Sequence, residues 1–547
     1  MKRIFLIAPL ALFLSFCSFA QTTQQQWHHL DPKTDSVMGI SSENAYKLLK
    51  TLPVPNQPVI VAVIDGGLDT GHEDLKSVLW TNPKEIAGNQ KDDDGNGFKD
   101  DLHGWNFLGG ADGQNAVHEQ KEETRLYVRL RPRYENVDPE TARKTFNSAQ
   151  NQEYELWKEI KPYFEKKKAE AIKDFQEDSL LLQQDKVAFT EFKKALSVNM
   201  VDTTVLQNLP ATDSLLTMQG LRYYQMMMQV GCGNIDCLVS FFEDLNASLK
   251  EQLTFDYNEN YNGRLLVDDT PSDLSQHNYG NPDISTPLTG NGAAHGTHVT
   301  GIIAADRHNG MGVQGVADHV RILFVRAAPD GDERDKDVAN AIVYAVDNGA
   351  KIINMSFGKA FSPEKAVVDK AVKYAEAKGV LLVVAAGNDH LNVDSTRQYP
   401  MAKYLNGAEA SNVIIVGASN ALNDSTLAAS FSNFGPKTVD VFAPGVEIMS
   451  TTPGNKYENK QGTSMASPVV AGIAGVLKSY FPKLSPADLK RIILKSAVIY
   501  HTQVLKPGTE TKVDFASLSK SGGIVNLYEA VKMAISETGK GGGKIGK

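Results

Sequence analysis

Four polar residues that stand near glycines carry groups able to act together on a carbonyl compound: Asp65, His295, Asn388 and Ser464. Serine is a weak nucleophile until a base removes its proton, and histidine does this near neutral pH. A carboxylate holds such an imidazole in the right tautomer and stabilises its protonated form. A side-chain amide and a main-chain N–H together stabilise an oxyanion. The four residue types therefore suffice for nucleophilic attack on a carbonyl group.

Ser464 lies in the stretch Gly-Thr-Ser-Met-Ala-Ser-Pro at residues 462–468, which continues into the small apolar run 469–475. Because residues 463–477 carry almost no charge, we expect a helix that is buried on most of its circumference. Ser464 would then lie at the helix N-terminus, where unpaired main-chain N–H groups can hold an anion. A serine that merely caps a buried helix is an equally good interpretation of this stretch taken alone.

Continuous apolar, β-branched runs predict strands that are buried on both faces of a parallel sheet. One run at residues 59–64 ends at Asp65, and another at residues 380–386 ends at Gly387 and Asn388. Similar runs alternate with helical patterns, the runs at 317–325, 351–355 and 413–417 and the patterns at 335–348 and 363–378. This alternation predicts an α/β fold with a doubly wound, mainly parallel sheet flanked by helices. Such sheets bind ligands at the carboxyl ends of their strands, where Asp65 and Asn388 are expected.

Four segments resemble the Asp, His, oxyanion and Ser blocks of the subtilisin-like serine proteases (subtilases, peptidase family S8). They are Val-Ile-Asp-Gly-Gly at 63–67, His-Gly-Thr-His-Val at 295–299, Ala-Ala-Gly-Asn at 385–388 and the serine stretch at 462–468. The order of Asp, His and Ser along the chain is that of subtilisin. The resemblance covers residues 59–107 and 290–500 and implies a subtilisin-like catalytic domain at 59–117 and 269–535.

The resemblance implies a serine endopeptidase that hydrolyses peptide bonds of protein or peptide substrates through an acyl-enzyme. Ser464 would be the nucleophile, His295 the general base and then acid, Asp65 the orienting carboxylate and Asn388 the oxyanion-hole donor. His298 is expected to be structural, since one imidazole suffices as base. Substrate contacts are expected from a peptide-pairing strand and from the wall of the pocket beside the scissile bond, at Ser356, Phe357, Gly358, Ala385, Ala386 and Gly387.

An acidic, glycine-rich loop at residues 92–101 has the spacing of a Ca²⁺ site. With Asp92 as position 1, oxygen-bearing residues occupy the ligand positions of an EF-hand-type loop, and Gly97 stands where that loop turns sharply. Position 12 is His103 rather than Glu, so the loop is not an EF-hand. A solvated acidic turn is the alternative. The candidate ligands are Asp92, Asp94, Asn96, Phe98 (through its carbonyl), Asp100 and Asp101.

The resemblance adds a second, weaker metal candidate. His-Glu-Asp-Leu at residues 72–75 resembles another subtilase block, whose aspartate can bind Ca²⁺, and Asp74 takes that place here. Ca²⁺ is thus the expected cofactor, in a structural role, and no organic cofactor is expected.

A helical insertion is predicted between the Asp and His blocks, at residues 118–268. Apolar residues three, four or seven apart line one face of a helix at 154–196, and further helices are expected at 213–230 and 238–253. A helical hairpin or small bundle is the simplest interpretation, and a groove for a protein partner is the alternative. Cys232 and Cys237 could form a short-loop disulfide or remain two free thiols. An insertion of this size could shade the cleft or narrow the choice of substrate.

The N-terminus predicts export. Lys2 and Arg3 precede the apolar stretch 4–16, and Ser-Phe-Ala at 18–20 provides small residues for cleavage before Gln21. We therefore expect a signal peptide at 1–20, an N-terminal arm at 21–58 and a periplasmic, cell-surface or extracellular protein. Cys17 raises a lipoprotein alternative, although Phe16 is bulky for that signal. A flexible Gly/Lys tail is expected at 536–547.

The composition is that of an ordinary globular protein with a large core, since 41% of the 547 residues are hydrophobic and 22% are charged. A net charge of −9 gives no reason to expect nucleic acid as a partner. After the signal, no apolar run is long enough for an integral membrane span. The leading prediction is a secreted serine endopeptidase. The alternative is a catalytically silent or narrowly specific protein that binds or processes a partner through the helical insertion.

Overall fold

The computed structural model describes residues 26–198, 200–207, 209, 214–230, 232–267, 269–285 and 291–539. The predicted signal peptide at 1–20, with Cys17, and the last residues of the predicted tail lie outside these ranges. Within them, no helix combines the length and the apolar character that a membrane span requires.

A nine-stranded sheet forms the centre of the described chain, with the strand order β10-β13-β7-β6-β5-β4-β1-β3-β2. Neighbouring strands pair in parallel, except β10 and β13, which are antiparallel. The α/β fold with a mainly parallel sheet is thus confirmed. The strands are β1 (Val59–Asp65), β2 (Gly104–Asn106), β3 (Val320–Arg326), β4 (Ile352–Met355), β5 (Leu381–Ala385), β6 (Val413–Ser419), β7 (Val441–Pro444), β10 (Val498–Ile499) and β13 (Gly523–Ile524).

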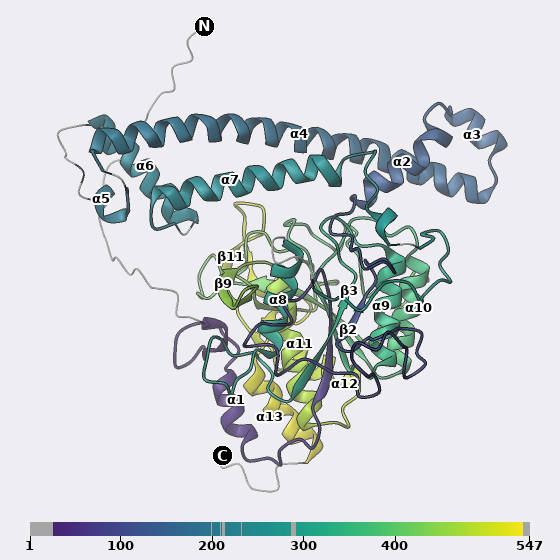
Figure 1. The fold of residues 1–547 in the computed structure, drawn as a ribbon. Coiled ribbons are helices and arrows are strands. Elements are labelled where there is room, and N and C mark those ends of the chain that lie inside the picture. Colours follow the sequence, from purple (N-terminus) through teal and green to yellow (C-terminus); the bar gives the residue numbers. More distant parts are fainter. Residues whose placement is uncertain are drawn as a thin grey trace.

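Helices cover both faces of this sheet (Figure 1). Alternate side chains of β1 enter different cores, because Val61 and Val63 belong to one and Ala62 and Ile64 to the other. This explains why the strands read as continuous apolar runs. One core includes α1 (Ser42–Leu49), α8 (Asn291–Ala304), α11 (Thr463–Tyr480), α12 (Pro486–Lys495) and α13 (Leu527–Thr538), and the other includes α9 (Asp335–Asp347) and α10 (Lys365–Ala377).

Helix α11 is buried on almost all sides, as its lack of charge predicts. A Cβ atom on Gly472 would lie 2.6 Å from the Cβ atom of Val316, so glycine is what allows this close approach. Gly462, with φ +148°, is the N-cap, and Ser464 is the second residue of the helix. Ser464 therefore does not cap α11, and the capping interpretation is wrong.

The remaining elements of the sheet-containing part are short. Two antiparallel pairs stand apart from the main sheet, β8 (Ile448–Thr452) with β9 (Lys456–Lys460) and β11 (Gln503–Leu505) with β12 (Lys512–Asp514). Short 3-10 turns occur at Trp27–His29, Gly263–Leu266 and Phe515–Leu518. Helix α13 ends at Thr538, and Gly539 is its C-cap with φ +66°. Residues 536–538, which were predicted as part of the flexible tail, are therefore helical.

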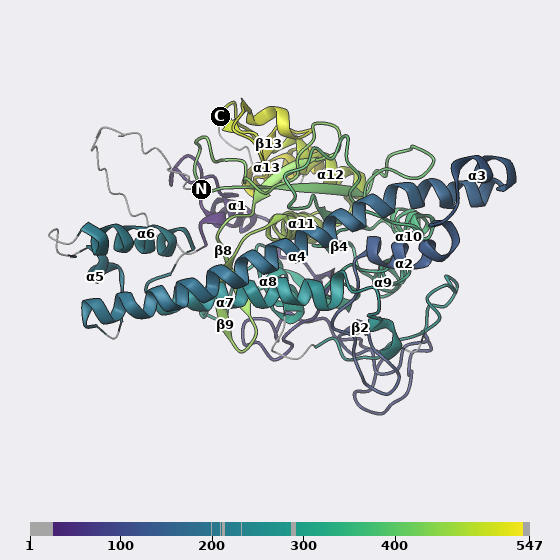
Figure 2. The ribbon, with the colours of Figure 1, turned by 90° about the horizontal axis from the view of Figure 1, so that it is seen from above.

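Six helices fill most of the described part of the predicted insertion, and the longest, α4, has 49 residues. Helices α4 and α7 lie side by side and cross one end of the sheet domain (Figures 1 and 2). A disulfide joins Cys232 to Cys237, so the chain adopts that alternative rather than two free thiols. The helices are α2 (Glu122–Tyr134), α3 (Pro139–Thr145), α4 (Ser148–Leu196), α5 (Thr203–Gln207), α6 (Ser214–Val230) and α7 (Ile235–Glu251), which a π-helical turn at Gln252–Asp256 follows.

The described residues of the insertion form two apolar cores, one of them shared with the sheet domain. The shared core, at the base of the insertion, includes Trp157 and Phe164 of α4 together with Phe361 from the sheet domain. The second core lies farther along α4 and includes Phe192, Met227 and Leu238. The apolar stripe of α4 is therefore a packing surface, which confirms the small-bundle interpretation.

Candidate active site

Asp65 and His295 form the first part of the site. Asp65 ends β1 and is buried, and its Oδ1 accepts a hydrogen bond from the Gly66 main-chain N–H at 2.8 Å. The Nδ1 atom of His295, in α8, lies 2.8 Å from Oδ1 and 3.0 Å from Oδ2 of Asp65. Since an ionised carboxylate only accepts, Nδ1 carries the proton and Nε2 is left as the basic nitrogen.

The charges around His295 favour its protonated form. Burial alone would lower the pKa of His295, but the charge of Asp65 and its hydrogen bond raise the pKa above its ordinary value. The nearby Asp330, which follows β3, adds to this rise. A base with a raised pKa takes a proton more readily, but it can act only at a pH high enough for the imidazole to be neutral.

Ser464 lies in the first turn of α11, which packs against α8. Its hydroxyl donates to the main-chain carbonyl oxygen of Ser356 at 3.0 Å. The Ser356 hydroxyl in turn donates to the main-chain carbonyl oxygen of Ser464 at 2.9 Å and lies 2.8 Å from the hydroxyl of Ser467. These contacts fasten the first turn of α11 to the segment that follows β4.

Asn388 follows β5 and lies beside the same turn. Its Oδ1 accepts from the main-chain N–H and the hydroxyl of Thr463, at 2.8 Å and 2.9 Å. This pair of bonds fixes which way the amide faces, and it leaves the Nδ2 group as a donor for something else. A Cβ atom built on Gly462 would lie 3.5 Å from Asn388 Nδ2 and 3.6 Å from the main-chain nitrogen of Ser464. Two donors therefore border one small space.

The loop that carries Asn388 is held by Asn433, which sequence reasoning missed. Asn433 Nδ2 donates to the Ala386 carbonyl at 2.9 Å, and its Oδ1 accepts from the N–H groups of Asp389 and Leu391 at 3.1 Å and 2.8 Å. Gly387 has φ +99°, and a Cβ atom there would lie 2.4 Å from Asn433 Nδ2. Asn433 lies far along the chain in an ordinary Ser-Asn-Phe-Gly turn, and no pattern in the sequence marks it.

The predicted substrate residues lie at the ends of neighbouring strands. Ser356, Phe357 and Gly358 follow β4 directly, and Ala386 and Gly387 follow β5, which ends at Ala385. Strands β4 and β5 are paired in parallel, so both segments leave the same edge of the sheet. Ser356 also takes part in holding α11, because its side chain is buried against Ser467.

His298, one turn beyond His295 in α8, has the surroundings of a structural residue. It is fully buried, and its Nε2 lies 3.0 Å from the Glu458 carbonyl oxygen. Burial lowers the pKa of His298 to about 3, so it stays neutral.

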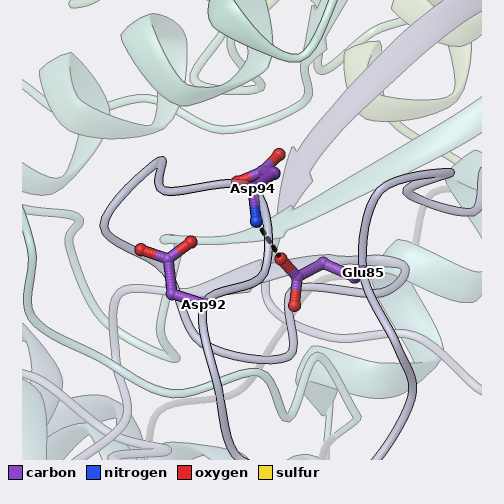
Figure 3. Close-up of side chains that lie close together, drawn as sticks. All are labelled: Glu85, Asp92 and Asp94. Atoms are coloured by element: carbon purple, nitrogen blue, oxygen red, sulfur yellow. Dashed lines mark hydrogen bonds between the residues drawn. The ribbon is translucent and has the colours of Figure 1, made fainter.

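The acidic loop brings together Glu85, Asp92 and Asp94 (Figure 3), each with one oxygen within 4.8 Å of the others. Glu85 lies outside the predicted loop, seven residues before Asp92, and nothing in the sequence around it points to a metal ligand. Its Oε1 accepts from the main-chain N–H groups of Asp93 and Asp94, at 2.9 Å and 3.2 Å. Its Oε2 is buried and has no hydrogen-bond partner in the part of the chain that the structure describes.

The other predicted metal ligands make different contacts. Asp100 accepts from the N–H groups of Asn89 and Gln90, and the side-chain Oδ1 of Asn96 accepts from the main-chain N–H of Phe98. Asp101 is buried, accepts from the Tyr344 hydroxyl at 2.7 Å, and has its pKa raised by burial to about 6. The structure does not bring Asp100 and Asp101 into the cluster. Asp74 lies elsewhere, buried, and accepts from Asn309 and from the Val313 N–H.

Comparison with known proteins gives a consistent result. The chain is 47% identical over 186 residues to the thermophilic serine proteinase of Bacillus sp. (strain AK1), which covers 34% of this chain and 42% of that protein. It is 44% identical over 196 residues to thermitase of Thermoactinomyces vulgaris, which covers 36% of this chain and 64% of thermitase. It is 38% identical over 212 residues to subtilisin BL of Lederbergia lenta, and this match covers 39% of this chain and 72% of subtilisin BL.

The matched region spans less than two thirds of the first two relatives. The sequence model of the subtilase family, peptidase S8, extends much farther and matches residues 56–523. This match contains Asp65, His295, Asn388 and Ser464 together with almost all of the central sheet. The chain belongs to the subtilase family.

Proposed function

We propose that this subtilase is an exported serine endopeptidase that hydrolyses peptide bonds through an acyl-enzyme on Ser464. The observation that carries the proposal is the bond of 2.8 Å between His295 Nδ1 and Asp65 Oδ1, because His295 lies in α8, which packs against the buried helix α11 that carries Ser464 in its first turn. A base that is oriented by a buried carboxylate next to a hydroxyl is the arrangement that activates serine.

A peptide paired with residues 356–358 presents its scissile carbonyl to Ser464. His295 Nε2 takes the hydroxyl proton as the Ser464 oxygen bonds to the carbonyl carbon and an oxyanion forms. Asn388 Nδ2 and the Ser464 main-chain N–H donate to that oxyanion. The tetrahedral intermediate then breaks its C–N bond, and the amine leaves with the proton from His295. Water attacks the acyl-enzyme by the same steps, which releases the acid and restores Ser464.

A fluorophosphonate probe tests the proposal directly, since it reacts with an activated serine. The wild type should take up one probe on Ser464 and cleave a peptide library, and Ser464→Ala should do neither. Removal of a triad member costs about 10⁴- to 10⁶-fold in kcat. A folded wild type that takes up no probe and cleaves no peptide would instead support the silent, partner-binding alternative.

Calcium is proposed as a structural cofactor held by Glu85, Asp92 and Asp94. The unpartnered, buried Oε2 of Glu85 fits this, because a carboxylate oxygen without a donor or cation is unfavourable in a buried position. Hard oxygen ligands of this kind suit Ca²⁺. When bound, the ion would neutralise the cluster and stiffen its loop, and it takes no part in the cleavage steps.

The insertion at 118–268 is proposed to limit which substrates reach Ser464, since α4 and α7 cross one end of the sheet domain (Figure 1). Export rests on the charged, apolar and small-residue order of residues 1–20. Fusion of this segment to a reporter, with secretion as the readout, tests export separately from catalysis.

A further inference from the structure

A cavity of about 630 Å³ lies beside the residues proposed to hold the oxyanion. One of its lining residues, His390, lies two residues after Asn388 along the chain. Another, Gln461, directly precedes Gly462, the N-cap of the helix that carries Ser464. The volume is within the range of pockets that bind ligands. A substrate bound at Ser464 can therefore extend into this cavity.

The cavity and the segment proposed to pair with the substrate lie on opposite sides of the oxyanion loop. The pairing segment, 356–358, follows β4, and Asn388 follows β5. Other walls of the cavity follow the next two strands of the sheet, with lining residues between 420 and 431 after β6 and Val446 after β7. These four strands pair in parallel, so the segments after them leave one edge of the sheet in the order pairing segment, oxyanion loop, cavity.

This order gives the direction of the bound peptide. A peptide that enters along 356–358 and crosses Ser464 carries the residues after its scissile bond toward the cavity. Strands β6 and β7 are the first and second beyond β5, and neighbouring strands lie about 4.8 Å apart. Since an extended chain advances about 3.3 Å per residue, the cavity is reached about two or three residues after the scissile bond.

The hairpin of β11 and β12 forms one wall of the cavity through residues 505–510. The hairpin is anchored, because Val504 is fully buried and the Leu505 N–H donates to the Ser425 carbonyl at 2.9 Å. A Cβ atom on Gly508 would lie 2.7 Å from the nearest ring atom of His390, so the hairpin loop packs directly against that ring. The wall is thus held in place beside the oxyanion loop.

His390 has an uncommon backbone conformation, with φ +49°. Its main-chain N–H donates to the carbonyl of Phe431, another lining residue, at 2.9 Å. A left-handed backbone at a residue other than glycine is strained and persists only where surrounding contacts impose it, often at a ligand site. The contacts of His390 therefore connect two walls of the cavity to the loop of Asn388.

The surface of the cavity is more apolar than polar. Aromatic and aliphatic carbon comes from the side chains of Phe431, Val446, Leu505 and Pro507. An apolar group that enters such a cavity is removed from water together with the walls that it contacts, and this favours binding.

Charge gives the cavity no clear sign. Its charged lining residues, Lys506 and Glu510, are of opposite sign. The Lys506 ammonium lies over the ring of Phe434, 5.3 Å from the ring centroid. The lining therefore suits an uncharged, apolar group better than an ion of either sign.

We propose that the cavity walled by the β11–β12 hairpin binds a large apolar side chain, aromatic or long aliphatic, of the second or third residue after the scissile bond. The gain in binding increases with the apolar area that the side chain buries against Phe431 and Leu505. The proposal rests on the proposed peptidase function and names a feature of its substrates.

Matched peptides test this preference. They share the residues before the scissile bond and carry phenylalanine, leucine, alanine, lysine or glutamate at each of the first four positions after it. Mass spectrometry identifies the bond that is cut. The wild type should show a kcat/KM roughly tenfold or more higher for phenylalanine than for alanine at the second or third position. Lysine and glutamate should give no such gain.

Variants of the hairpin test the cavity itself. Replacement of residues 507–510 by Asn-Gly removes part of the wall and leaves Lys506 and Thr511, which are bonded through Lys506 N–H, joined by a two-residue turn. This variant and Leu505→Ala should each lower the ratio of kcat/KM for phenylalanine to that for alanine roughly threefold or more. Lys512→Ala, at an exposed position of β12 outside the cavity, should keep the ratio. Uptake of a fluorophosphonate on Ser464 shows that each variant is folded.

The outcomes separate this proposal from the proposed function. Equal kcat/KM for phenylalanine and alanine in the wild type, or a gain confined to the first or fourth position, would overturn the proposal while the peptidase function stands. A gain that survives both hairpin variants, or a higher kcat/KM for lysine or glutamate than for phenylalanine, would overturn it as well. A folded wild type that takes up no probe and cuts none of the peptides is instead the failure of the proposed function.

Discussion

The hydroxyl oxygen of Ser464 lies 3.0 Å from the main-chain carbonyl oxygen of Ser356 and donates its hydrogen there. That carbonyl belongs to the segment proposed to pair with the substrate. Catalytic hydrogen bonds often form only in the substrate complex. A peptide N–H that takes the Ser356 carbonyl would free the hydroxyl to turn to His295, so that substrate binding itself readies the nucleophile.

Asn388→Ala should lower kcat about 10²- to 10³-fold and change KM little, because the Nδ2 donor acts on the oxyanion and not on the bound peptide. Thr463→Val keeps the main-chain N–H that orients Asn388 and removes only the hydroxyl, so its loss should be smaller, roughly tenfold. Steady-state kinetics of both variants on one peptide provide the check. A rise in KM at constant kcat would argue against the oxyanion role.

Asp330→Asn should move the acid limb of the kcat/KM profile to lower pH. His295 must be neutral to act as base, and its activity is lost as pH falls through its pKa. Since the negative charge of Asp330 contributes to the raised pKa of His295, removal of that charge lowers the pKa. Asp174→Asn, in an exposed part of α4, serves as the control and should leave the profile in place. The profiles are measured at constant ionic strength, because salt screens such charges.

Stability should fall as pH drops below about 6.5, partly because of His298. Its folded-state pKa of about 3 lies below that of the unfolded chain, so the unfolded state binds the extra proton between these values. Stability from this group is therefore full above pH 6.5 and is lost progressively toward pH 3. Each such histidine contributes at most about 1.4 kcal/mol per pH unit.

Urea unfolding in a Ser464→Ala background, where self-digestion is absent, measures this dependence. His298→Asn should flatten the fall in unfolding free energy between pH 7 and pH 5, and His277→Asn, at an exposed position, should not. An unchanged slope in His298→Asn would mean that the buried histidine is not a source of acid sensitivity.

Calcium should raise the melting temperature, and EGTA should reverse the rise. A ligand at 100 times its Kd stabilises a protein by about 2.7 kcal/mol, which is enough for a shift of a few degrees. Glu85→Gln should weaken the response strongly because it removes a ligand of the proposed site. Asp100→Asn should retain it, since Asp100 instead accepts from the N–H groups of Asn89 and Gln90. If the calcium-induced rise in melting temperature is lost in Asp100→Asn and kept in Glu85→Gln, the ligands are those predicted from the loop spacing and not the cluster of Glu85, Asp92 and Asp94.

Local patterns predicted much of this molecule. The apolar run before Asp65 is a central strand, and the uncharged run after Ser464 is a buried helix. Both could be predicted because an element that is buried on all sides is apolar along its whole length. Contacts between distant segments produce no such local pattern. Asn433 holds the loop of Asn388 from another part of the chain, and Glu85 joins an acidic loop whose spacing pointed to Asp100.

The backbone at Gly462 has a consequence for what evolution can vary here. The methyl group that alanine would bring to this residue would lie 3.5 Å from Asn388 Nδ2 and 3.6 Å from the Ser464 nitrogen. Those are the two donors proposed to hold the oxyanion, so the methyl group would compete with the negative oxygen for the same volume. Glycine at this position therefore leaves space for the oxyanion of the tetrahedral intermediate, which exists only during the reaction.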